Sequence, residues 1–232
     1  MPTLTPTKID GATSKMVTPM TYVDPDALVT DDMLVKQISM KGVNVPFVAD
    51  FLSAAVTHER CGVHLYRTVA SRSLNPMLQR RYEEFGDETR RHVEILEELI
   101  SSAGGNPMYA SPMARAVEGM DSKLVESTFA VAGSADLMLR EMVMLDAVFL
   151  AETVCHANWD AVAQLTAELP KGKVRTAFQR AVDEVQDQED QHLEWARDTR
   201  AKLTLLQAQG SMMAKAGEKA EEVVARIKGW FS

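Results

Sequence analysis

The sequence predicts an all-α protein, built as a four-helix bundle from two antiparallel helix hairpins with one long crossover between them. Four long stretches of helix-forming residues carry no internal proline, and they cover 46–73, 77–103, 135–168 and 173–207. Tight turns separate the first from the second and the third from the fourth, whereas about 30 residues lie between the second and the third. Short connections favour antiparallel neighbours, and the long one can cross the length of a bundle. No stretch has the alternating pattern of a β-strand.

Proline and glycine mark the ends of the first two long helices. Pro46 can occupy the first turn of a helix, where its missing N–H costs nothing, and Asn75-Pro76 closes that helix. The second helix ends at the Gly-Gly-Asn-Pro run 104–107, which is a strong stop signal. The crossover that follows contains Ser111-Pro112 and is expected to hold a short helix near 122–131.

Proline and glycine also mark the ends of the last two long helices. The third helix stops at Pro170-Lys171-Gly172, and the fourth is expected to end near Gly210. The chain therefore divides into an extended N-terminal arm (1–45), a helical bundle (46–207) and a C-terminal tail (208–232). The arm is rich in proline and threonine, with one short helix expected around Asp31–Met40. The tail has apolar residues at helical spacing over 215–231, which predicts a short amphipathic helix.

Composition excludes several classes of protein. The 232 residues carry a net charge of −8, which argues against a general nucleic-acid-binding protein because such proteins neutralise phosphates. No apolar run approaches the 18 or more residues of a membrane span, and the first residues do not resemble a secretory signal. The two cysteines are too far apart to form a metal-binding CxxC pair. We therefore expect a cytoplasmic location.

Each long helix has an apolar seam, meaning the stripe of residues at alternating spacings of three and four that should face the core. Every seam is interrupted near the middle of its helix by a glutamate, and these are Glu59, Glu88, Glu152 and Glu189. A histidine follows on three of the seams, as His92, His156 and His192. Antiparallel helices that pack side by side bring their midpoints to one level. Four carboxylates and at least two imidazoles should therefore meet in one buried layer.

Carboxylates gathered in this way repel one another and lose their hydration, so something must neutralise them. Protons could do so in part, but two divalent cations do it better. Carboxylate oxygens and imidazole nitrogens are ligands that suit iron or manganese. The layer therefore predicts a metal site with Glu59, Glu88, Glu152 and Glu189 among its residues, together with His92 and His192.

The same residues resemble the ferritin-like di-metal carboxylate family, which includes rubrerythrin-type and bacterioferritin-type proteins. The family pattern is one glutamate from each of two helices and a Glu-x-x-His from each of the other two. Glu59 and Glu152 match the single glutamates, and Glu189 with His192 matches the Glu-x-x-His of the fourth helix. The second helix departs from the pattern, because His92 follows Glu88 by four residues instead of three. The second site is then either distorted or bound by Glu88 only indirectly.

Other residues on or near the seams have simpler interpretations. His156 is either an additional ligand or a buried histidine with a hydrogen-bond partner. Tyr66 is expected to be a packed core tyrosine, and Cys61 and Cys155 to be buried free thiols. His58 and His64 lie off the seam and are expected to be partly exposed, and Glu98 is expected to face solvent.

The resemblance implies two bound iron ions, or manganese as the alternative, that react with dioxygen or hydrogen peroxide. Ferroxidase activity, peroxide reduction, hydroxylation and catalase-type disproportionation are all compatible with such a centre. With no rubredoxin-like CxxC pair, the electron donor would be external, and a homo-oligomer is possible. Two alternatives stay open: an iron-storage or metal-binding protein without turnover, and a non-catalytic helical interaction protein whose carboxylates are protonated or ion-paired.

Overall fold

The computed structural model describes residues 42–131, 133 and 137–215, and the side chains of this part as far as residue 209. Within these ranges the chain is helical and contains no strand, so the all-α prediction is confirmed. The helices are α2 (Val45–Arg72), α3 (Pro76–Ser102), α4 (Pro112–Ala130), α5 (Leu137–Glu168) and α6 (Lys173–Lys215). The N-terminal arm with its expected short helix, and the tail helix beyond residue 215, lie outside the described residues.

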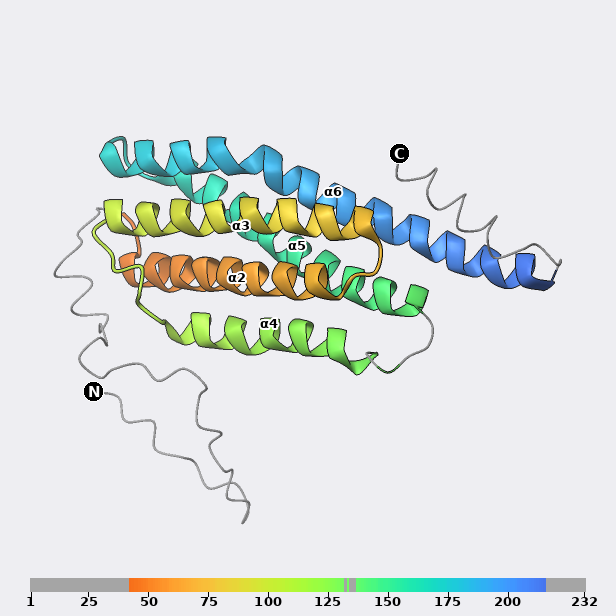
Figure 1. Cartoon of the computed structure of the whole chain (residues 1–232). Coiled ribbons are helices and arrows are strands. Elements are labelled where there is room, and N and C mark those ends of the chain that lie inside the picture. The colour runs from red at the N-terminus through yellow and green to blue at the C-terminus, as the bar shows by residue number, and fades with distance from the viewer. Residues whose placement is uncertain (1–41, 132, 134–136, 216–232) are drawn as a thin grey trace, which may run out of the picture.

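The four long helices lie side by side and their contacts close a ring (Figure 1). Helix α2 packs against α3, and α5 packs against α6, so the two tight turns produce the two expected hairpins. Contacts of α3 with α6 and of α2 with α5 join the hairpins to each other. Helix α4 forms most of the crossover and packs on α2 and α5 from outside the ring. It begins ten residues earlier than the short helix that was expected there.

Side-chain caps fix where α3 and α4 begin. Asn75 accepts hydrogen bonds from the backbone N–H groups of Met77 and Leu78, and Pro76 fills the first position of α3. Ser111 caps α4 in the same way by accepting from the N–H of Ala114. Gly104 ends α3 with a φ of 87°, in the left-handed region that glycine adopts without steric cost. The Asn-Pro and Ser-Pro pairs of the sequence are therefore helix starts.

Helix α6 is longer than predicted. It continues through Gly210 to Lys215, whereas the sequence pattern predicted a helix over 173–207 that ends near Gly210. A glycine inside a helix costs only about 1 kcal/mol relative to alanine, and no proline follows it in the chain. Figure 1 shows the last part of α6 projecting beyond the ends of the other helices.

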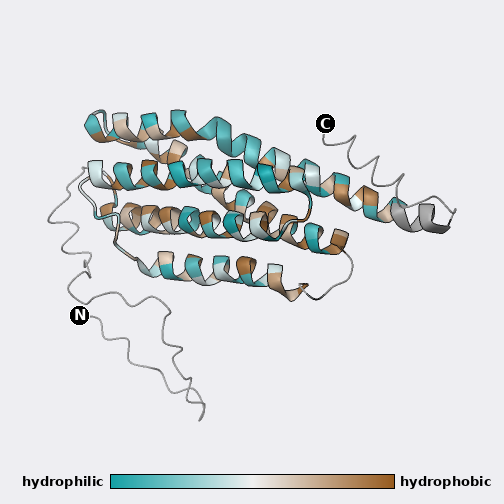
Figure 2. Cartoon of the chain, in the orientation of Figure 1, coloured by the Kyte–Doolittle hydropathy of each residue, from teal (hydrophilic) through white to brown (hydrophobic). Residues whose placement is uncertain are grey.

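The core consists of two apolar clusters, one toward each end of the ring of helices. Figure 2 shows that the long helices carry both apolar and hydrophilic residues along their length. One cluster includes Leu52, Leu99 and Phe178, and the other includes Leu78 and Leu145. Along every long helix the chain passes from one cluster to the other through a short polar stretch. These four stretches meet in the layer that was predicted from the seams.

Helix α4 buries His58, which was wrongly predicted to be partly exposed. The side chain is 2% exposed, with Nδ1 2.8 Å from Oδ2 of Asp121 on α4 and Nε2 3.0 Å from the backbone oxygen of Ala151 on α5. Burial disfavours the imidazolium, but the hydrogen bond and negative charge of Asp121 outweigh it and raise the pKa of His58 to about 9. His58 is therefore charged at neutral pH, and it ties α4 to both hairpins.

We expect Asp121→Ala to lower the free energy of unfolding by about 3 kcal/mol, because it leaves the charged His58 buried without its partner. Urea unfolding followed by circular dichroism measures this loss. Glu126→Ala is the control, since Glu126 forms an exposed ion pair with Lys123 on the same helix. That variant should stay within about 0.5 kcal/mol of the wild type. Equal effects of the two substitutions would contradict the role assigned to the His58–Asp121 pair.

Candidate metal centre

Three carboxylates and two imidazoles occupy the layer between the two apolar clusters. Glu59 comes from α2, His92 from α3, Glu152 from α5, and Glu189 and His192 from α6. None of the five residues is more than 4% exposed. The neighbouring turns of the same helices carry apolar side chains on both sides, so water has little access to the layer.

His92 lies closest to two of the carboxylates. Its Nδ1 is 2.9 Å from Oε1 of Glu189 and 3.9 Å from Oε2 of Glu59. One ligand atom from each of these three residues can be chosen so that all three atoms lie within 4.8 Å of one another. This spacing would allow a single cation to contact all three.

His192 forms the second half of the layer with Glu152. Its Nδ1 is 3.4 Å from Oε2 of Glu152. The rings of His92 and His192 are stacked with centroids 5.8 Å apart. The layer therefore has two halves side by side, each with a histidine Nδ1 and at least one carboxylate oxygen.

The outer nitrogens of both histidines are held by acceptors. Nε2 of His92 donates to the amide oxygen of Gln188 at 2.8 Å, and Nε2 of His192 donates to Oε2 of Glu88 at 2.6 Å. An amide oxygen and a carboxylate can only accept, so each Nε2 carries a proton. In the neutral imidazole the lone pair is then on Nδ1, which faces the carboxylates. This is the tautomer a histidine needs to bind a metal through Nδ1.

The outer oxygens of the two single glutamates are also fixed. Oε1 of Glu59 accepts from Nε1 of Trp159 at 2.7 Å and from the thiol of Cys155 at 3.0 Å. Oε1 of Glu152 accepts from the hydroxyl of Tyr66 at 2.7 Å. Each carboxylate thus has one oxygen held by neutral donors and the other, Oε2, turned into the layer.

The atoms that face the layer have no hydrogen-bond partner outside it. They are Oε2 of Glu59, Oε2 of Glu152, both oxygens of Glu189 and Nδ1 of both histidines. Within the layer, Nδ1 of His92 and Oε1 of Glu189 lie at ion-pair distance. Buried polar atoms without a partner destabilise a fold, and several carboxylates together destabilise it further. A cation contacting these atoms would satisfy all of them. The donor set, with carboxylate oxygens and imidazole nitrogens, suits iron, manganese or zinc.

Without a metal the protein must hold protons in the layer. Burial and the nearby charge of Glu189 raise the pKa of Glu59 to about 7. Burial opposes the charged form of His92, but Glu189 and Glu59 outweigh it and raise its pKa to about 9. The negative charge of Glu189 contributes to both shifts, so a positive charge placed in the layer would stabilise it.

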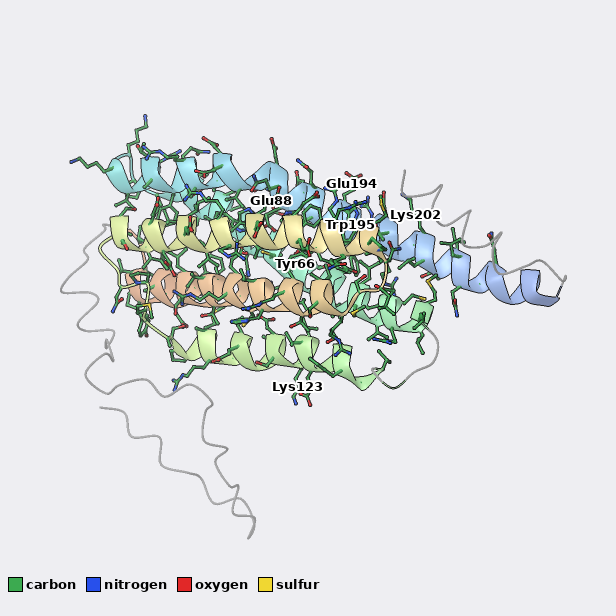
Figure 3. The ribbon with its side chains drawn as sticks, in the orientation of Figure 1. Tyr66, Glu88, Lys123, Glu194, Trp195 and Lys202 are labelled. Carbon is green, nitrogen blue, oxygen red and sulfur yellow. The ribbon has the colours of Figure 1, made fainter. Side chains whose placement is uncertain are left out.

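The structure brings together five of the six residues that the sequence proposed as ligands, and it places Glu88 differently. Glu88 contacts the outer nitrogen of His192, its side chain is 41% exposed, and Figure 3 shows it on α3 near α6. This corresponds to the indirect role that the spacing of four residues left open. Thr89, which is three residues before His92, donates its hydroxyl to the backbone oxygen of Phe85.

His156 lies outside the layer. Its Nε2 is 2.7 Å from Asp190, its Nδ1 is 3.5 Å from Asp160, and its side chain is 24% exposed. Cys61 is half-buried and Cys155 is buried, and both are free thiols. Burial and the surrounding carboxylates raise the pKa of Cys155 well above its usual range, so this thiol stays protonated.

Two residues that support the layer were not singled out in the sequence. They are Gln188, which directly precedes the predicted ligand Glu189, and Trp159 on α5. The spacing of the sequence could have identified Trp159 as a hydrogen-bond donor to the layer. Tyr66 and Trp159 each follow the glutamate of their own helix by seven residues. That distance is two turns of helix, so each donor faces the same side as the glutamate before it.

Comparison with known proteins gave no match to a family model, to a curated protein or to a solved structure. No helix in the described part of the chain is long and apolar enough to cross a membrane. The chemistry of the layer is therefore the basis for assigning a function.

We expect Tyr66→Phe to weaken metal binding at least tenfold, because it removes the hydrogen bond that orients Glu152. Calorimetric titration of the metal-free protein with Mn²⁺ measures the change. Tyr82→Phe is a matched control, since Tyr82 is also buried but its hydroxyl has no partner. It should bind Mn²⁺ as the wild type does. A similar loss in both variants would show that general packing, and not the bond to Glu152, controls binding.

Proposed function

We propose that this protein is a ferritin-like di-metal carboxylate oxidoreductase, which binds two iron or manganese ions in the layer between its apolar clusters. The observation that carries the proposal is the set of six buried atoms that face one another with no hydrogen-bond partner outside the layer, from Glu59, Glu152, Glu189, His92 and His192. Three carboxylates balance three of the four positive charges of two divalent ions, and the two Nδ1 atoms supply the neutral ligands. The arrangement of two hairpins with one long crossover agrees with this proposal.

The residues around the layer would hold the ions and limit what reaches them. Gln188 and Glu88 orient the two histidines, while Trp159 and Tyr66 orient the two single glutamates. The apolar clusters on either side exclude bulk water, which strengthens every charge interaction inside the layer. When bound, two ferrous ions would supply electrons for the reduction of dioxygen or hydrogen peroxide. An external donor would return those electrons, since the chain has only two separated cysteines.

The buried hydroxyl of Tyr66 and thiol of Cys155 donate hydrogen bonds to the glutamates and would not bind the metal themselves. Burial and the charge of Glu152 raise the pKa of Tyr66 well above its usual range. Its hydroxyl therefore stays protonated and donates a hydrogen bond to Glu152. Cys155 likewise stays protonated and donates a hydrogen bond to Glu59. Both groups therefore stabilise the ionised carboxylates that a cation needs.

We expect the chain, reconstituted with ferrous iron and exposed to air, to hold about two iron ions and to consume dioxygen as it oxidises them. Elemental analysis, visible absorption and an oxygen electrode measure these properties. His92→Ala and His192→Ala should each lose metal and slow oxygen consumption at least tenfold, whereas Glu98→Ala, at an exposed site on α3, should change neither. A chain that remains metal-free with both iron and manganese would contradict the proposal.

Metal binding should also stabilise the folded protein. At a free metal concentration one hundred times Kd the gain is about 3 kcal/mol, because the ligands meet only in the folded chain. Thermal unfolding with and without Mn²⁺ measures this gain as a rise in Tm. An unchanged Tm, with Mn²⁺ shown to be bound, would place the bound ion on the surface and not in the buried layer.

A further inference from the structure

The two hairpins repeat one arrangement around the layer. Glu59 on α2 corresponds to Glu152 on α5, and the donors Tyr66 and Trp159 follow them at the same spacing. Each donor binds the glutamate of the other hairpin, and both hydrogen bonds are 2.7 Å long. The halves of the layer are therefore related by an approximate two-fold symmetry, with every support crossing from one hairpin to the other.

The outer supports of the histidines follow the same symmetry but differ in charge. Glu88 and Gln188 each precede the histidine of their own helix by four residues, and each accepts from the histidine of the other hairpin. His92 is thus supported by a neutral amide, whereas His192 is supported by a carboxylate. A carboxylate behind an imidazole makes the inner nitrogen a stronger metal ligand.

The inner carboxylates also differ between the two halves, but here the half around His92 has the additional negative charge. Glu189 lies three residues before His192, and its counterpart on α3 is Thr89. Glu189 lies 2.9 Å from Nδ1 of His92, across the hairpins, but the hydroxyl of Thr89 is bound to its own helix backbone. The half around His92 therefore has two inner carboxylates close to it, while the half around His192 has Glu152 and no counterpart of Glu189.

We infer that the two halves bind metal with unequal affinity and in a fixed order, and that Glu88 is a positioning residue for the second ion. This inference rests on the di-metal function proposed above. The first cation binds to Glu59, His92 and Glu189, where more negative charge is already assembled. The second binds to Glu152 and His192 against the charge of the first ion. Glu88 offsets that repulsion by adding a negative charge behind His192.

The decisive substitution is Glu88→Gln. Gln188 shows that a glutamine at the corresponding position accepts the N–H of a histidine in this layer, at 2.8 Å. The variant therefore keeps the shape and the hydrogen bond and removes only the charge. A purely structural role for Glu88 would leave metal binding unchanged in this variant.

The test is titration of the metal-free full-length chain with Co²⁺, followed by calorimetry and by visible absorption. We expect two binding events with Kd values at least tenfold apart. Glu88→Gln should weaken the second event at least tenfold and change the cobalt absorption of that event, leaving the first intact. Glu189→Gln should weaken the first event until it can no longer be separated from the second. Glu98→Gln, an exposed glutamate on the same helix, should leave both events unchanged.

The possible failures can be told apart. Two equivalent binding events in the wild type would overturn the unequal halves while leaving the di-metal function in place. A single event with one ion per chain would overturn the second site. Equal weakening of both events by Glu88→Gln would overturn the role of Glu88. No binding of Co²⁺, Fe²⁺ or Mn²⁺ at all would overturn the inference together with the proposed function.

Discussion

Three carboxylates buried within one layer of a helical core repel each other, and this repulsion is the constraint that organises the centre of the molecule. Glu59, Glu152 and Glu189 are each no more than 4% exposed, so water cannot screen them. The fold surrounds them with groups that favour negative charge, namely the Trp159 indole, the Tyr66 hydroxyl and two imidazoles. The apolar clusters at either end supply the burial free energy that holds such a layer together.

The cross-hairpin pattern of these bonds explains how two separate helix pairs form one site. Every support of the layer starts on one hairpin and ends on the other, so the ligand atoms reach their positions only when the hairpins are docked. The contacts also leave one oxygen of Glu59, one of Glu152, and Nδ1 of each histidine facing inward. A protein that needed only a stable core would fill this volume with apolar side chains, because a buried charge cluster adds no net stability. The presence of such a cluster in the core is what favours a metal-binding role.

The sequence was sufficient to predict the long helices and the depth at which their polar residues meet. Proline, glycine and asparagine mark the helix ends, and a seam of spacing three and four identifies the face that is buried. The position of α4 could not be predicted in this way, because periodicity does not show which outer face a crossover helix covers. His58 was therefore expected to be partly exposed, although α4 buries it against Asp121. Glu88 was ambiguous for a different reason: spacings of three and four both point to the same side of a helix, and only tertiary contacts separate a ligand from its support.

X-ray diffraction from crystals of the manganese- or iron-loaded protein, with anomalous data at the absorption edge of the metal, is the most direct test of this account. It predicts two anomalous peaks in the layer, one in coordinating contact with Nδ1 of His92 and one with Nδ1 of His192, with Glu88 and Gln188 still bound to the outer nitrogens. Crystals of metal-loaded protein with no anomalous peak between these histidines, or with peaks only at exposed acidic residues, would contradict it.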